Sequence, residues 1–155
     1  MQENQSLINF MNQQVSNFAL MYVKLHRYHW FVQGRHFFML HEKYEEWYEL
    51  FGNYLDEMAE RVLAIGGKPL ATMKKFLNET TLKEAEADDK EAEMLAELHA
   101  DFSQIAAELK EGIDLCAEHE DEPSADLMIR IEGELEKQAW MIRSAMAYED
   151  QMMHK

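Results

Sequence analysis

Apolar residues recur at three- and four-residue steps along most of the chain, and this pattern predicts four long helices. The first carries its apolar residues over positions 7–28, and Gly34 separates it from the second, about 37–65. The apolar face of the second includes Trp47 and Tyr48, and Gly66-Gly67-Lys68-Pro69 ends it. The third carries its apolar stripe over residues 94–116, with Asp88 and Glu91 as a capping pair at its start. The fourth begins near Pro123.

The connections between these helices predict the fold class. Two are short, near Gly34 and near Asp121, whereas the middle one, about residues 67–88, is long. Met73, Phe76 and Leu77 within it indicate a short extra helix. Short–long–short connectivity is typical of a ferritin-like four-helix bundle, in which one crossover makes the second and third helices parallel. We therefore predict an all-α fold in a single domain over residues 1–155.

Composition indicates the cellular compartment in which such a bundle is expected. Hydrophobic residues make up 47% of the 155 residues, but they are interleaved with charge, so the sequence predicts no membrane-spanning helix. The first residues, MQENQSLINF, have neither the basic nor the apolar part of a secretory signal. The single cysteine, Cys116, excludes an intrachain disulfide and lies on an apolar face, which predicts a packing role. A cytoplasmic location is the expectation.

Charge points to cations as partners. The formal net charge is −15, from 30 acidic and 15 basic residues. The first basic residue is Lys24, and neither end of the chain carries a basic cluster. Because affinity for nucleic acid comes mostly from lysine and arginine on phosphates, we expect no DNA binding. An acidic surface attracts cations, although the same charge could serve solubility alone.

Candidate metal ligands lie at both ends of the second helix. His29 ends the first helix and His41 begins the second, so an antiparallel hairpin brings them to the same height. Glu45 lies one turn from His41, and Asp56 and Glu60 share a face at the far end. Imidazole nitrogen with carboxylate oxygen suits iron, zinc or manganese. Solvated acidic pairs and packed histidines are the alternatives.

The spacing of these residues indicates a site built by two chains. His41 and Asp56 are fifteen residues apart, which is roughly 22 Å along a helix, so one ion cannot bind both ends. A dimetal centre inside one bundle needs Glu-x-x-His motifs, and the sequence has none. If two chains pair antiparallel, the histidine end of one meets the acidic end of the other. A two-fold axis then gives two identical sites for each dimer.

The same stretches resemble a known family. HWFVQGRHFFMLHEKYE (residues 29–45) with LDEMAERVLAIGGKP (55–69) is similar to the Dps family of mini-ferritins, and EKQAWM (136–141) extends the resemblance. The resemblance implies a ferroxidase in a hollow homododecamer that oxidises Fe(II), preferentially with hydrogen peroxide, and stores Fe(III) mineral. It implies ligands from two subunits, His29 and His41 from one and Asp56 and Glu60 from the other. Glu45 matches a position close to that centre, as a weak ligand or a neighbour of the ligands.

Two further expectations follow from the resemblance. Asp121 and Asp126 match the acidic pores through which family members admit iron, although a helix N-cap role competes for both. The alternative functions are a DNA-protecting or structural particle with little ferroxidase activity, and a ferritin that uses dioxygen as its oxidant.

Overall fold

A computed structural model describes residues 3–85 and 90–153 of the chain. These ranges form the helices α1 (Gln5–Phe31), α2 (Phe37–Ala64), α3 (Met73–Glu79), α4 (Glu91–Glu118) and α5 (Glu122–Met153). The four long helices and the short extra helix are therefore confirmed, with bounds within a few residues of those that the apolar pattern predicts. Over the described ranges, the β-type pairing is limited to one isolated bridge between Gln33 and Lys90. None of the helices described is long and apolar enough to cross a membrane.

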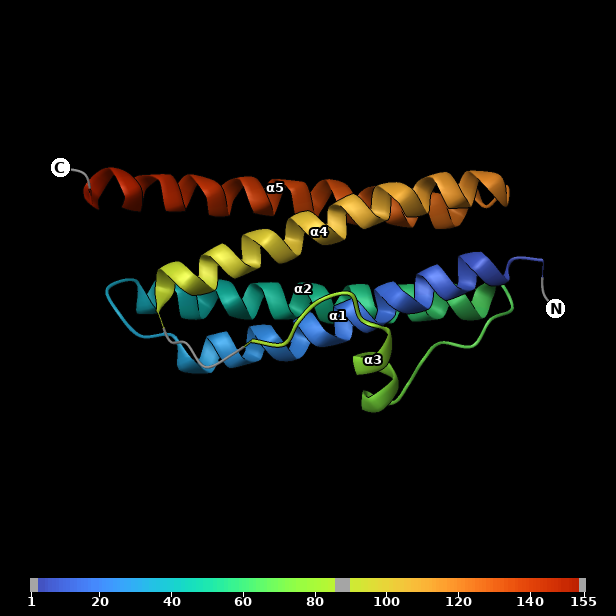
Figure 1. Ribbon diagram of the computed structural model, residues 1–155, viewed down its shortest axis with the longest axis horizontal. Coiled ribbons are helices and arrows are strands. Elements are labelled where there is room, and N and C mark those ends of the chain that lie inside the picture. Colours follow the sequence, from blue (N-terminus) through green and yellow to red (C-terminus); the bar gives the residue numbers. More distant parts are fainter. Residues whose placement is uncertain (1–2, 86–89, 154–155) are drawn as a thin grey trace.

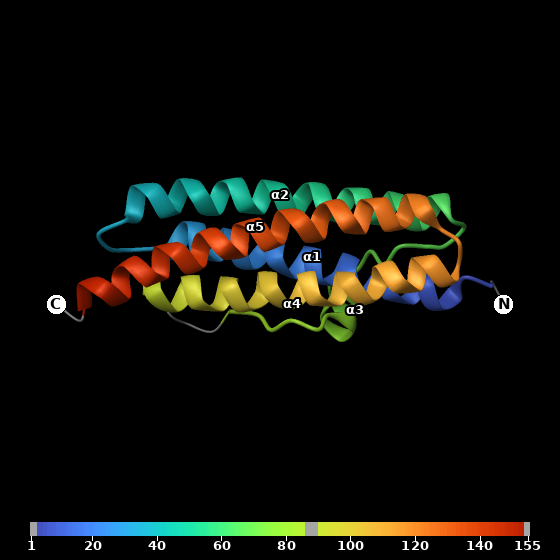
Figure 2. The same cartoon turned by 90° about the horizontal axis from the view of Figure 1, so that it is seen from above.

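The four long helices form a bundle of two antiparallel hairpins, α1 with α2 and α4 with α5 (Figure 1). Because the crossover returns along the length of the bundle, α2 and α4 run in the same direction, as Figures 1 and 2 show. The short helix α3 packs on the outside of α1. This is the predicted ferritin-like arrangement.

The core is aromatic at its centre. Phe51 on α2 contacts Phe18 of α1 and Phe102 of α4, with ring centroids 6.0 and 5.4 Å apart. Trp47 lies edge-on to Phe102 at 5.3 Å. Tilted and edge-on pairs of this kind stabilise a core beyond the area that they bury. The stripes that predict the helices therefore meet in one continuous core.

Buried asparagines on α1 hold the long crossover against the bundle. Asn12 donates to the carbonyl of Lys68 (3.1 Å) and accepts from the amide of Leu70 (3.0 Å). Asn17, which is fully buried, accepts from the backbone amide of Thr81 (2.9 Å). A loop of this length needs partners for its backbone groups, and α1 supplies them.

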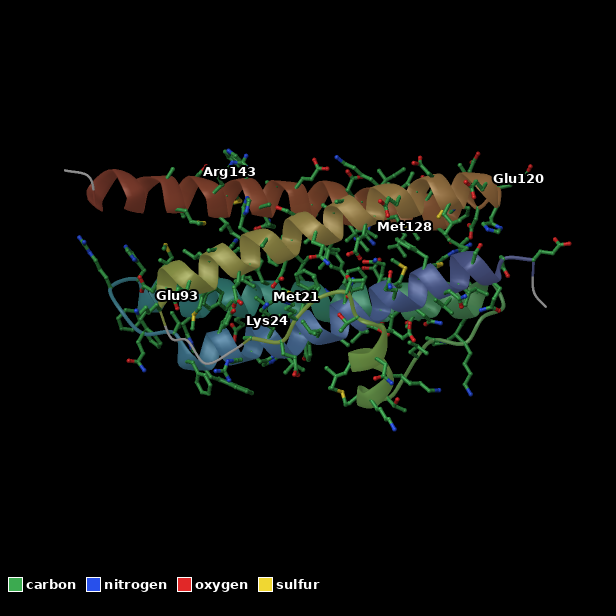
Figure 3. The ribbon with its side chains drawn as sticks, in the orientation of Figure 1. Met21, Lys24, Glu93, Glu120, Met128 and Arg143 are labelled. Atoms are coloured by element: carbon green, nitrogen blue, oxygen red, sulfur yellow. The ribbon has the colours of Figure 1, made fainter. Side chains whose placement is uncertain are left out.

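A buried ion pair completes this anchoring. Lys24 on α1, labelled in Figure 3, is 4% exposed. Its ammonium lies 2.7 Å from the carboxylate of Asp101 on α4 and donates to the carbonyl of Lys83 at 3.1 Å. One side chain thus ties together α1, α4 and the end of the crossover.

The predicted capping pair at the start of α4 includes Asp88, which lies outside the described residues. The helix itself begins at Glu91, with Lys90 at the N-cap position. The Glu91 carboxylate instead accepts from the backbone amide of His36 (2.8 Å) and from its Nδ1 (3.0 Å). Glu91 therefore fastens the turn between α1 and α2 to the start of α4.

Candidate metal centre

The α1–α2 turn brings His29 and His41 into direct contact, as the sequence predicts. Their rings stack with centroids 3.7 Å apart and planes 12° apart. Nδ1 of His29 lies 2.6 Å from the carbonyl oxygen of His41, and Nδ1 of His41 lies 2.7 Å from the carbonyl oxygen of His29. The two residues therefore hold each other by a reciprocal pair of hydrogen bonds across the hairpin.

This reciprocal pairing fixes the protonation pattern of both rings. A carbonyl oxygen can only accept, so each Nδ1 carries the proton and donates it. Each Nε2 of a neutral ring is then left with its lone pair. Histidines that bind metals are held in this way, by donating their other ring nitrogen to a carbonyl or carboxylate. His29 also lies in the last turn of α1, where carbonyls lack partners within the helix, and His41 satisfies one of them.

Glu45 and Tyr48 lie on the same face of α2, one and two turns beyond His41. The Tyr48 hydroxyl donates to Glu45 Oε1 at 3.2 Å, and the Tyr48 ring is edge-on to His29 at 5.4 Å. Burial and, after it, the Glu45 carboxylate raise the pKa of Tyr48, so its hydroxyl keeps its proton at neutral pH. The stacked imidazoles and the Glu45 carboxylate thus lie within about two turns of each other at this end of α2.

Asp56 and Glu60 lie together at the other end of α2, and both are exposed. A hydrogen bond with Asp56 and the negative charge of that neighbour raise the pKa of Glu60. The two carboxylates, four residues apart, share one helix face as predicted. An arriving cation would relieve the repulsion between them.

The histidine end and the acidic end do not meet within one chain. Over the described residues, no group of three or more His, Cys, Asp or Glu side chains is placed to hold a metal ion. One chain therefore carries two candidate half-sites, His29 with His41 and Asp56 with Glu60, at opposite ends of α2.

The two candidate pore residues differ in their surroundings. Asp121 precedes α5 and accepts from the Ser124 amide (3.1 Å) and from Arg61 (3.3 Å). It therefore acts as the N-cap of α5, which was the competing role. Asp126 is exposed on the first turns of the same helix. A role of either residue in a pore stays a prediction.

The contacts of Tyr48 with Glu45 and of His36 with Glu91 were not predicted from the sequence. The i,i+3 spacing of Glu45 and Tyr48 was an available signal, since such pairs share a helix face. The contact between His36 and Glu91 joins residues 55 positions apart and left no local signal.

Comparison with known proteins gives consistent matches over nearly the whole chain. The family model described as "Ferritin-like domain" matches residues 8–152. The chain is 45% identical over 141 residues to general stress protein 20U of Bacillus subtilis, covering 91% of this chain and 97% of that protein. It is 42% identical to DNA protection during starvation protein 2 of Bacillus anthracis, with the same coverage. Among solved structures, Dps from Bacillus brevis matches with a TM-score of 0.91 and 42% identity, covering 93% of this chain and 98% of that one.

Proposed function

This chain belongs to the Dps family of mini-ferritins, and from that premise we propose that it is a ferroxidase that oxidises Fe(II) at sites shared between two subunits. Proteins of this family store iron, protect the cell and form oligomers. The observation that carries the proposal is the stacked pair of His29 and His41, because their reciprocal hydrogen bonds leave two Nε2 lone pairs for a metal.

The missing ligands come from a second copy of the chain. In an antiparallel pair, Asp56 and Glu60 of one subunit face His29 and His41 of the other, and the two-fold axis repeats the arrangement. The axis then crosses α2 midway between the two half-sites, around residues 48–51. Each dimer contains two complete sites, each with two imidazoles and two carboxylates.

The surface of α1 and α2 supports pairing at this face. The accessible surface of the chain is 9154 Å², against roughly 8,100 Å² for a typical monomer of this mass. Several large apolar side chains on these two helices are exposed, which is typical of an interface. They include Tyr22, Trp30, Phe38 and Leu63.

The proposed chemistry follows from the ligand types. Neutral imidazole binds Fe(II), and the hard carboxylates hold both Fe(II) and the Fe(III) product. Four protein ligands leave positions for water and hydrogen peroxide. Two Fe(II) ions, each giving one electron, reduce one peroxide to water without releasing hydroxyl radical. The Fe(III) then leaves as hydrolysed mineral for storage in the cavity of a homododecamer.

Anaerobic protein mixed with Fe(II) and then with hydrogen peroxide or dioxygen tests the proposal. We expect ferric absorbance to rise faster with peroxide, and the rate to collapse in Asp56→Asn. The matched control is Glu49→Gln, which removes an exposed carboxylate from the same helix and should keep the wild-type rate. An oxidation rate no higher than that in buffer alone would overturn the ferroxidase proposal and favour a structural or DNA-protecting particle. Equal rates with the two oxidants would indicate a dioxygen-using ferritin.

Iron entry through a pore is the second part of the proposal. Asp126 is exposed near the start of α5, and Asp121 lies beside it with its carboxylate bonded to Ser124 and Arg61. Asparagine is also a good N-cap, so Asp121→Asn with Asp126→Asn should slow iron uptake more than it lowers stability. Unchanged uptake by this double variant would remove the pore from the proposal.

Protection of DNA, which the Bacillus anthracis relative carries in its name, would here come from removing iron rather than from contact with DNA. The net charge of −15 opposes binding to phosphates. A gel-shift assay of the protein with DNA at physiological salt should show only free DNA. Tight complexes would overturn the proposal that protection needs no contact with DNA.

A further inference from the structure

We propose that Tyr48 is a positioning residue of the metal centre, which holds the Glu45 carboxylate on the face of α2 that also carries His41. This inference rests on the proposed function, since Glu45 needs positioning only if a metal binds beside it. It adds a residue outside the ligand set with a role that can be measured separately.

Tyr48 contacts both helices that supply the histidine half-site. Its hydroxyl donates to Glu45 Oε1 at 3.2 Å on α2. Its ring stands edge-on to His29 of α1, with centroids 5.4 Å apart and planes at 84°. One side chain therefore sets the place of a carboxylate and borders an imidazole of the same site.

The Tyr48 ring is itself held in one orientation. It stacks on His26 with centroids 3.6 Å apart and planes 20° apart, and Tyr22 meets it edge-on at 6.0 Å. His26 is fixed in turn, because its Nδ1 donates to the carbonyl of Tyr22 at 2.6 Å. The hydroxyl thus points at Glu45 from a fixed ring rather than from a mobile one.

The core does not require this hydroxyl. Tyr44 and Tyr54, on the same helix, are 0% and 1% exposed, whereas Tyr48 is only half-buried on the face that carries the half-site. Glu45 is exposed and has several freely rotating bonds. A hydrogen bond to a fixed donor selects one of its conformations before a metal arrives, and such preorganisation strengthens binding.

Co(II), a redox-silent probe of the ferrous site, provides the test. Anaerobic titrations of the assembled protein, followed by visible absorption, compare wild type with Tyr48→Phe, Glu45→Gln and the double variant. We expect each single change to weaken Co(II) binding about tenfold, as for other groups that orient metal ligands. The double variant should be no weaker than Glu45→Gln alone, because the hydroxyl acts only through that carboxylate.

Tyr54→Phe is the matched control. It removes a hydroxyl from the same helix, but from a ring that packs in the core against Phe18 and Phe51 rather than on the face that carries the half-site. Its Co(II) affinity should equal that of wild type. The melting temperature and the assembly of Tyr48→Phe should also be unchanged, since the stacked ring remains.

The outcomes separate this inference from the function on which it rests. Wild-type affinity in Tyr48→Phe, or losses that add up in the double variant, would overturn the role of Tyr48 and leave the metal site intact. A fall in melting temperature that accounts for the lost affinity would make Tyr48 structural and also overturn it. A Co(II) affinity of His29→Ala equal to that of wild type would instead overturn the proposed metal site, and the role of Tyr48 with it.

Discussion

Mixing two inactive variants should restore activity if the metal centre is shared between chains. His41→Ala removes a ligand from the histidine half-site, and Asp56→Ala removes one from the acidic half-site. Within one chain these halves are separated by fifteen residues of α2, roughly 22 Å, and do not form a common cluster. In a mixed dimer, one site takes its histidines from the Asp56→Ala chain and its carboxylates from the His41→Ala chain. That site is intact, and the other lacks both groups.

The activity expected of a mixture follows from the fraction of its sites that are complete. A site is complete only when the Asp56→Ala chain supplies its histidines and the His41→Ala chain supplies its carboxylates. The probability of a complete site is therefore the product of the mole fractions of the two chains. At equal amounts and random pairing, about one site in four is complete, and the activity should be about a quarter of the wild type. The activity should trace a parabola with its maximum at equal amounts and fall to the background of each variant at the two ends.

The assay uses assemblies formed from both chains at several ratios, by co-expression or by refolding together. Mass spectrometry gives the composition, and ferric absorbance after Fe(II) and peroxide gives the rate. A mixture of His41→Ala with His29→Ala is the control, because both changes damage the same half-site and every site stays incomplete. A shared site predicts recovery in the first mixture alone.

Two results would refute the reasoning. If no ratio raises activity above the parent variants, although mixed assemblies form, each site takes its ligands from one chain. If the control mixture recovers as much as the test mixture, His29 and His41 act in different sites, and their stacking is structural.

Three further predictions concern stability and reactivity. Burial raises the pKa of Cys116 to about 11, so roughly one thiol in a thousand is ionised at pH 8 and a disulfide reagent should label it only after unfolding. Lys24→Met should lower the free energy of unfolding by about 3 kcal/mol in urea titrations, and adding Asp101→Leu should recover most of it. Because burial raises the pKa of Asp101, the loss should shrink as the pH falls through that raised value, and should be smallest below about 3.9, where Asp101 is protonated in both the folded and the unfolded chain. Gly112→Ala places a Cβ 2.2 Å from the Phe10 ring and should cost about 1–3 kcal/mol, whereas Gly133→Ala meets nothing within 4 Å and should gain about 0.5–1 kcal/mol in thermal unfolding.

The elements of this fold follow from the sequence because each depends on local information. Apolar periodicity sets the helices, and Gly34 and the Gly66–Pro69 stretch set two of the breaks. The meeting of His29 and His41 follows from their nearly equal distance from one turn. The anchoring of the crossover does not follow, because a buried Asn12 or Asn17 looks the same in sequence as a solvated one.

The contacts that orient the site depend on rings and carboxylates far apart in the chain. Glu91 sits at the start of α4, yet it bonds to His36 in the α1–α2 turn, 55 residues earlier. The Tyr48 ring takes its orientation from His26, which belongs to another helix. Local patterns identify ligands by type and spacing, but their orientation needs the packed tertiary structure.

The division of the candidate site into halves ties its activity to assembly. An unpaired chain carries two imidazoles at one end of α2 and two repelling carboxylates at the other. If iron binds as proposed, neither half alone offers a complete ligand set, and we expect a free subunit not to oxidise Fe(II). The proposed pairing would supply the opposite half and take exposed apolar side chains of α1 and α2 out of water in the same step. In the proposed function, iron oxidation thus begins only in assemblies that can also store its product.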